Sequence, residues 1–133
     1  MLSLDEVIAN IQRQRALREE HLSLDDLKRQ FENVPDPLRH PEEFLRSDGA
    51  TAVIAEIKRA SPWGVYSTVD DPAPLAQAFE CGGAAMLSVV TESSYFHGQY
   101  SDFARVKAAT TSPVLCKDII LSAYQVFEAR RNG

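Results

Sequence analysis

Three charged residues in apolar surroundings are the residues of this chain best suited to chemistry. Glu56 and Lys58 lie in the run from Val53 to Lys58, which is otherwise apolar and predicts a buried strand of a parallel sheet. Lys117 lies in a second such run, where side-chain alternation puts it on one face with Leu115. Burial disfavours the charge of a lysine, so its pKa moves readily, which suits acid catalysis or anion binding. A purely structural ion pair of Glu56 and Lys58 is the alternative.

The elements that would position these residues repeat one plan. Each predicted strand is followed by a predicted helix, and the strand starts are spaced by roughly 30 residues, the size of a βαβ unit. We therefore predict an α/β chain with parallel strands. Ligands of such folds bind at the C-terminal ends of the strands, where Lys58 and Lys117 would converge. The predicted strands are residues 53–58, 86–91 and 114–120, and the helices begin near Asp71, Ser101 and Ser122.

Residues 1–50 predict a helical extension that precedes the α/β part, residues 51–133. The run Ser3-Leu4-Asp5-Glu6 has the form of a capping box, so a first helix is expected to reach about Glu20. Ser23 can cap a second helix that Pro35 and Pro37 would end. Residues 35–50 read mostly as connection. Because each helix has one apolar stripe, we expect both to pack on the strand-rich part downstream.

Composition limits the partners and the compartment. The chain has 133 residues and a formal net charge of -5 without a basic block, which argues against nucleic acid or an anionic membrane as partner. No stretch approaches the ~18 apolar residues of a membrane span, and the N-terminus lacks a secretory pattern, so we predict a cytoplasmic protein. Cys81, Cys116 and the histidines lack metal-ligand spacing, and no glycine-rich nucleotide loop occurs. Neither a metal nor a cofactor is therefore predicted.

Three blocks of the sequence share the pattern of one enzyme family. The blocks are Glu56-Ile57-Lys58-Arg59-Ala60-Ser61-Pro62, then Ser88-Val89-Val90-Thr91-Glu92 with Tyr95-Phe96-His97-Gly98, then Pro113-Val114-Leu115-Cys116-Lys117-Asp118 with Tyr124-Gln125. They resemble the indole-3-glycerol phosphate synthase family. The resemblance covers nearly all of residues 1–133. It implies a (β/α)8 barrel lyase of tryptophan biosynthesis. Such an enzyme closes the indole ring of 1-(2-carboxyphenylamino)-1-deoxyribulose 5-phosphate, with decarboxylation and dehydration and without a cofactor.

The resemblance implies catalytic roles for the three charged residues. Lys117 would act as the general acid towards the carbonyl and hydroxyl oxygens of the substrate. Lys58 would contact the anionic substrate, and Glu56 would orient the lysines and help later proton transfers. Negative charge develops on oxygen during ring closure, so an ammonium group is a suitable donor. A Lys117 that pairs with Asp118 or extends to solvent remains the alternative.

The same resemblance implies substrate-binding roles for three further residues. Ser61 and Pro62 would belong to a loop that closes over the site, and Phe96 would form an aromatic wall for the anthranilate ring. Phe96 as a plain core residue is the alternative. The chain departs from the usual family pattern at Trp63, in the loop, and at Ile119, where an aromatic ring is usual.

The length of the chain predicts an incomplete barrel. A (β/α)8 barrel needs ~250 residues, so we expect the N-terminal half: the helical extension and three βα units. Alone it should be inactive, and it should self-associate or be complemented by the missing barrel half. Two alternatives stay open: a non-catalytic fragment acting as an interaction or structural unit, or another phosphosugar barrel enzyme. Association would use the edges at 53–58 and 114–120 and an inner face with Ile54, Leu87, Val89 and Leu115 as candidates.

Overall fold

The chain forms two compact units in a computed structural model that describes residues 3–31, 40–45 and 51–133. One unit comprises Met1–Asp36 and Ile119–Asn132, and the other comprises Pro37–Asp118 with Gly133. Each unit buries its own apolar residues. The boundary predicted near residue 50 stays a prediction.

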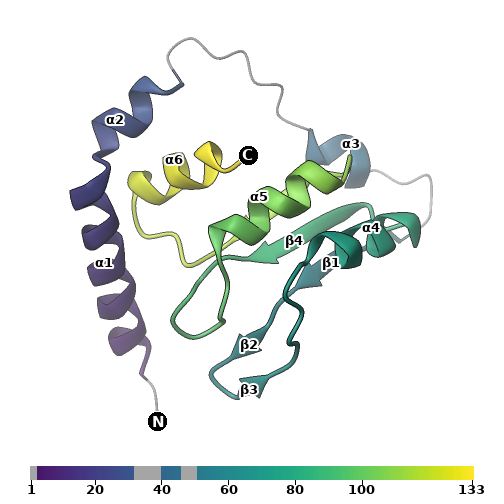
Figure 1. Cartoon of the computed structure of the whole chain (residues 1–133), viewed down its shortest axis with the longest axis horizontal. Helices are drawn as coiled ribbons and strands as arrows, with labels where there is room; N and C mark the ends of the chain where they lie inside the picture. The colour runs from purple at the N-terminus through teal and green to yellow at the C-terminus, as the bar shows by residue number, and fades with distance from the viewer. Residues whose placement is uncertain (1–2, 32–39, 46–50) are drawn as a thin grey trace. The chain divides into compact units, whose positions relative to one another are not determined.

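The larger unit is built on a parallel sheet covered by two helices. Its strands β1 (Ile54–Ile57), β4 (Met86–Val90) and β5 (Val114–Lys117) are ordered β1-β4-β5. Helices α4 (Ala73–Cys81) and α5 (Tyr100–Ala109) pack on one face of this sheet (Figure 1). The predicted alternation of parallel strands and helices is thus confirmed. The core between the layers is Ile57, Ala76, Leu87, Val89, Phe103 and Val106.

The register of the sheet corrects the predicted inner face. Leu87 and Val89 belong to the core beneath the helices, so their predicted place beside Ile54 and Leu115 is wrong. All residues of β4 are buried, so its sequence has no polar alternation that distinguishes the two faces. We call the other side of the sheet the Glu56 face. Its residues are Ile54 and Glu56 of β1, Met86, Ser88 and Val90 of β4, and Leu115 and Lys117 of β5.

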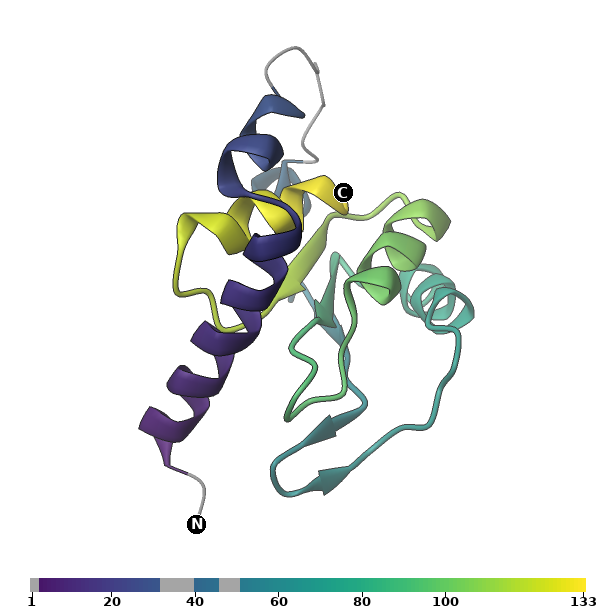
Figure 2. The ribbon, with the colours of Figure 1, turned by 60° about the vertical axis from the view of Figure 1, so that its left-hand side comes forward.

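Two short elements of this unit were not predicted. A hairpin of β2 (Ala60–Ser61) and β3 (Gly64–Val65) follows β1 and extends beyond its end (Figure 2). The carbonyl oxygen of Arg59 closes the base of the hairpin, because it accepts hydrogen bonds from the Tyr66 and Ser67 amides at 2.7 and 3.0 Å. Helix α3 (Pro41–Leu45) lies in the stretch that we expected to be mostly connection.

The smaller unit is helical. It contains α1 (Leu4–His21), α2 (Leu24–Arg29) and α6 (Ala123–Arg131), and α1 and α2 pack against α6. The predicted capping box of Ser3 and Glu6 is confirmed, with hydrogen bonds of 2.8 and 3.2 Å. Arg18 donates to both carboxylate oxygens of Glu128 at 2.6 and 3.0 Å, which fixes α1 on α6. Pro35 and Pro37, the predicted helix ends, lie outside the described residues. None of the helices described is long and apolar enough to cross a membrane.

Candidate active site

The carboxylate of Glu56 lies between two lysines at the C-terminal ends of parallel strands. Lys117 is the last residue of β5, and its Nζ donates to Oε2 of Glu56. Lys58 directly follows β1, and its Nζ lies 3.5 Å from Oε1 of Glu56. The structure thus brings together the three residues predicted to be catalytic. Lys117 pairs with Glu56, whereas Asp118 accepts a hydrogen bond from the Thr91 hydroxyl at 2.9 Å.

This cluster is open to a ligand. The exposed fractions of the Lys117, Lys58 and Glu56 side chains are 52%, 35% and 29%. Ion pairs this exposed contribute about 0 to 1 kcal/mol to stability, so a purely structural role explains the cluster poorly. Exposed ammonium groups held by a carboxylate can instead donate hydrogen bonds to an anionic or carbonyl oxygen.

The electrostatics keep Glu56 ionised. Burial disfavours the carboxylate and acts to raise the pKa of Glu56, but the hydrogen bond and charge of Lys117, and then those of Lys58, outweigh it. The pKa of Glu56 therefore lies below its ordinary value. At neutral pH the group is a carboxylate that can orient two lysines.

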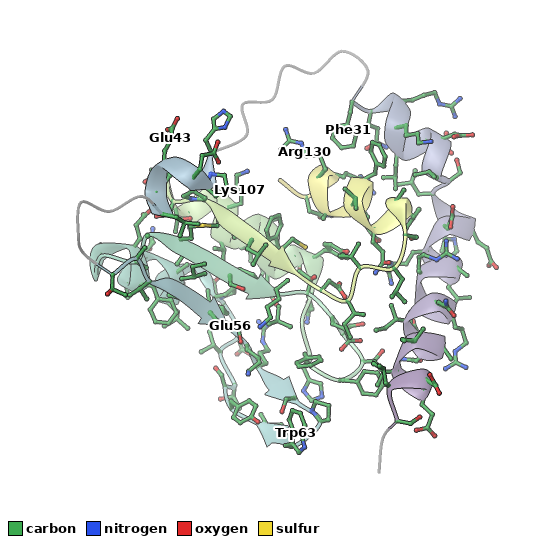
Figure 3. All side chains as sticks on the ribbon, turned by 180° about the vertical axis from the view of Figure 1, so that it is seen from behind. Phe31, Glu43, Glu56, Trp63, Lys107 and Arg130 are labelled. Carbon is green, nitrogen blue, oxygen red and sulfur yellow. The ribbon has the colours of Figure 1, made fainter. Side chains whose placement is uncertain are left out.

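The β2–β3 hairpin carries Ser61 and Pro62 beside this cluster. The Ser61 hydroxyl lies 2.8 Å from the hydroxyl of Tyr66, and the Tyr66 ring centre lies 5.0 Å from Nζ of Lys58. Pro62 and Trp63 at the turn are exposed, Trp63 to 88%. Figure 3 shows Glu56 at the sheet and Trp63 far out on the hairpin. The hairpin therefore contacts the cluster at its base and presents an uncovered tip.

Phe96 contributes to this region through its backbone as well as its half-buried ring. Its carbonyl oxygen accepts a hydrogen bond from the Ala60 amide at 3.1 Å, which joins the hairpin to the loop after β4. That loop is organised by Glu92, whose carboxylate accepts from the amides of Ser94, Tyr95 and Phe96 at 2.8, 2.7 and 3.1 Å. Glu92 is 6% exposed. It shapes the loop around Phe96, and its oxygens are already occupied.

A buried ion pair also fixes the hairpin, and sequence reasoning missed it. Both terminal nitrogens of the Arg59 guanidinium donate to Asp102 of α5, one at 3.0 Å. Nε of Arg59 donates to the carbonyl oxygen of Val69 at 3.0 Å. Asp102 raises the pKa of Arg59 through its hydrogen bond, although burial acts to lower it. The partners lie 43 residues apart, so no local pattern could have paired them.

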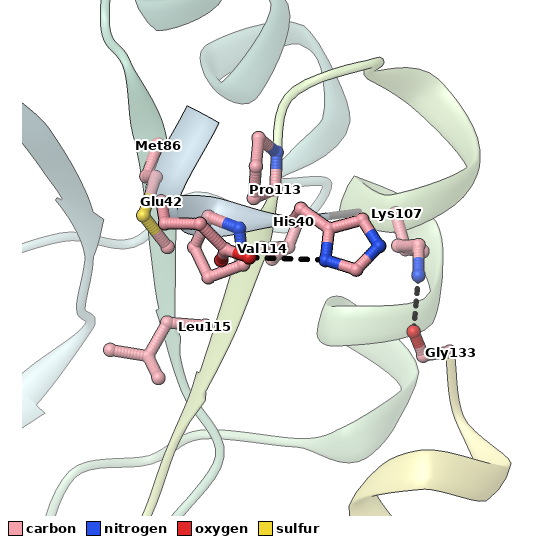
Figure 4. A pocket seen from close by; sticks show the side chains of 9 residues that line it. His40, Glu42, Met86, Lys107, Pro113, Val114, Leu115 and Gly133 are labelled. Carbon is pink, nitrogen blue, oxygen red and sulfur yellow. Dashed lines mark hydrogen bonds and ion pairs between the residues drawn. The ribbon is translucent and has the colours of Figure 1, made fainter. Parts of the chain in front are cut away.

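Among the cavities lined by described residues, two lie at opposite ends of the sheet. The larger, about 440 Å³, lies at the N-terminal ends of β4 and β5, with Met86 and Val114 in its lining (Figure 4). The smaller, about 190 Å³, is lined by Glu56, Lys58 and Arg59 among others. Parallel sheets bind ligands at the C-terminal ends of their strands, so the position of the smaller cavity favours it as the ligand site. Volume alone would favour the larger cavity. Among the residues described, no group of His, Cys, Asp and Glu could hold a metal ion.

Comparison with known proteins gives the family. The family model described as "Indole-3-glycerol phosphate synthase" matches residues 4–133. The chain belongs to this family. An indole-3-glycerol phosphate synthase of a Nocardioides species is 45% identical over 134 residues, covering 100% of this chain and 51% of its own length. Those of Mycolicibacterium vanbaalenii and Mycolicibacterium smegmatis are 45% and 44% identical, each covering 98% of this chain and 47% of its own length.

Membership of the indole-3-glycerol phosphate synthase family confirms the resemblance read from the three sequence blocks. The chain spans about half the length of the curated relatives it matches. The cluster of Glu56, Lys58 and Lys117 is therefore the candidate part of an active site that lies within that half.

Proposed function

We propose that this chain supplies the Lys117, Lys58 and Glu56 part of an indole-3-glycerol phosphate synthase active site. The substrate would be 1-(2-carboxyphenylamino)-1-deoxyribulose 5-phosphate, and no cofactor would take part. The observation that carries the proposal is the Glu56 carboxylate held by two lysines at the C-terminal ends of β1 and β5. We also propose the cytoplasmic location that the sequence predicts.

Lys117 is the proposed proton donor. Ring closure joins the ring carbon that bears the carboxylate to the ketone carbon, whose oxygen gains an electron pair and takes a proton. The carbon–carboxylate bond then breaks and carbon dioxide leaves, and the new hydroxyl leaves as water after a second protonation. The Lys117 side chain is 52% exposed, and its ammonium has one carboxylate partner among the described residues, so it can reach such an oxygen. Proton transfer of this kind contributes typically about 10² to 10⁴ in rate.

Lys58 and Glu56 complete the proposed group. Lys58 keeps an ammonium beside the hairpin, where it can contact an anionic substrate group. Glu56 holds both lysines in place and can accept a proton during the later steps. Ser61, Pro62 and Phe96 would close over the substrate, because the hairpin and the loop after β4 meet through the bond from Ala60 to Phe96.

We further propose that the three βα units are the first units of a (β/α)8 barrel. The parallel order β1-β4-β5 with covering helices fits that architecture. Among the described strands β1 and β5 each have one neighbour, so further strands can pair with both edges. A polypeptide that supplies these strands would be a complementing partner.

The decisive assay mixes this chain with the C-terminal half of the Nocardioides relative and measures formation of indole-3-glycerol phosphate. We expect product from the mixture and none from either half alone, because catalytic groups that act as a unit lose nearly all activity when one is absent. Lys117→Ala should lower turnover of the mixture by at least about 10²-fold. Lys28→Ala, an exposed lysine of α2, is the matched control and should leave turnover unchanged.

Three outcomes would contradict the proposal. Product from the purified chain alone would show that no second half is needed. Unchanged turnover in Lys117→Ala at saturating substrate would remove Lys117 from proton transfer. A mixture of two folded, associated halves that binds another phosphosugar and forms no indole product would favour a different barrel enzyme.

A further inference from the structure

A buried hydroxyl lies unused next to the proposed catalytic group. Ser88, in the middle of β4, is 3% exposed, and its Oγ has no hydrogen-bond partner among the residues described. Buried polar groups are usually hydrogen-bonded, so such an exception calls for a cause. None of the roles derived above uses Ser88.

The register identifies the polar neighbour of this hydroxyl. Ser88 pairs with Glu56 of β1 on one side and with Leu115 of β5 on the other. Neighbouring strands are about 4.8 Å apart, and paired residues of a parallel sheet point to the same face. Along β4 the same face holds Met86 and Val90, which are apolar. Glu56 is therefore the acceptor nearest to the Ser88 hydroxyl within the Glu56 face.

We propose that Ser88 is a positioning residue that donates its hydroxyl to the Glu56 carboxylate when Lys117 turns to a bound substrate. Lys117 donates to Oε2 of Glu56, and Lys58 lies near Oε1. A lysine that protonates a substrate oxygen must loosen its bond to Glu56, which leaves a carboxylate oxygen without its donor. The Ser88 hydroxyl can rotate to fill that place, so Glu56 keeps its position and its charge.

This inference deepens the proposed function. It rests on the proposed function only for the step in which Lys117 turns from Glu56 to the substrate. The link between Ser88 and Glu56 can be measured without catalysis. Replacing Lys117 by alanine removes the competing donor permanently, so the hydroxyl should then bind Glu56 in the free chain. The pKa of Glu56 reports that bond directly, because a hydrogen bond to the carboxylate lowers the pKa.

The experiment measures the pKa of Glu56 by carboxyl carbon NMR in the 133-residue chain and its variants. With Lys117 present, Ser88→Ala should leave the pKa of Glu56 unchanged. In the Lys117→Ala background, Ser88→Ala should raise that pKa by about one pH unit, a tenfold change in the ionisation equilibrium. Ser122→Ala is the matched control, because its Oγ is also buried without a partner among the described residues, but it lies in the helical unit.

A second pair of variants keeps the test valid if Ser88→Ala fails to fold. Ser88→Thr and Ser88→Val have nearly the same shape and differ in the hydroxyl, so in the Lys117→Ala background only threonine should keep the pKa of Glu56 low. Equal pKa values with and without the hydroxyl in that background would overturn the proposal. If Ser88→Ala raised the pKa of Glu56 while Lys117 is present, the proposal that the Ser88 hydroxyl replaces Lys117 as the donor to Glu56 would be overturned. Either result leaves ring closure by the complemented enzyme as a separate question.

Discussion

Replacing Arg59 by alanine should cost this protein a large part of its stability. Asp102 is 2% exposed, and Arg59, with a side chain 17% exposed, supplies its only side-chain partner among the described residues. Alanine leaves the Asp102 carboxylate buried without a counterion. Breaking a buried pair in this way costs about 3 to 5 kcal/mol, whereas domains are stable by about 5 to 15 kcal/mol.

Urea unfolding followed by circular dichroism measures this loss. With a slope of about 1.5 kcal/mol per molar urea, a loss of about 3 kcal/mol lowers the midpoint by about 2 M. Arg105→Ala, an exposed arginine of the same helix as Asp102, is the control and should change stability by less than about 0.5 kcal/mol.

A double variant tests the cause. Arg59→Met combined with Asp102→Leu removes both charges and fills the site with apolar side chains, so it should recover most of the stability that Arg59→Ala loses. If the double variant were no more stable than Arg59→Ala, an unpaired buried charge would not be the reason. If Arg59→Ala unfolded at the same urea concentration as Arg105→Ala, the ion pair would contribute nothing measurable.

Three further outcomes are expected. Glu80 accepts hydrogen bonds from the backbone and hydroxyl of Ser112, which with burial opposing lower its pKa from 4.5 to about 2. The contribution of ionised Glu80 to stability should be complete above about pH 4.5 and vanish as the pH falls through about 2. The melting temperatures of the parent chain and of Glu80→Gln should therefore converge over that range. Gly98→Ala should destabilise the chain by about 1 to 3 kcal/mol in urea unfolding, because a Cβ there would collide with the Val90 carbonyl. The purified chain should sediment at micromolar concentration as dimers or larger species, because β1 and β5 have open edges among the described strands and Ile54 and Leu115 are 46% and 45% exposed; a compact monomer would contradict this.

The alternation of parallel strands and helices could be predicted from the sequence because each strand and helix has a local sequence pattern. Strands rich in apolar residues and the spacing of roughly 30 residues between them are visible in one dimension. The same patterns placed Lys58 at the end of the first predicted strand and Lys117 within the third, which was predicted as 114–120 but ends at Lys117 in the structure. The structure brings both lysines to Glu56. The alternating direction of side chains along β1 and β5 was sufficient to assign their faces, because the charged residues of each strand mark one face.

The sequence failed where structure depends on contacts between distant residues or on very few residues. The uniformly buried β4 hid which face holds Leu87 and Val89, and only its pairing with β1 and β5 decides it. The β2 and β3 strands have 2 residues each, too few for any periodicity. Arg59 and Asp102 look like ordinary surface residues until the fold brings them together.

The hairpin after β1 has a consequence for protein engineering. Its base is held by the carbonyl and guanidinium of Arg59 and by the Phe96 carbonyl, whereas Pro62, Trp63 and Gly64 at the turn are exposed. A segment fastened at both ends tolerates exchange of the residues between them. Libraries that vary Pro62, Trp63 and Val65 and keep Gly64, whose φ of 157° suits glycine, could therefore be screened for altered substrate preference while Lys58 and Glu56 keep their places. The turn could thus be exchanged while the rest of the site keeps its structure.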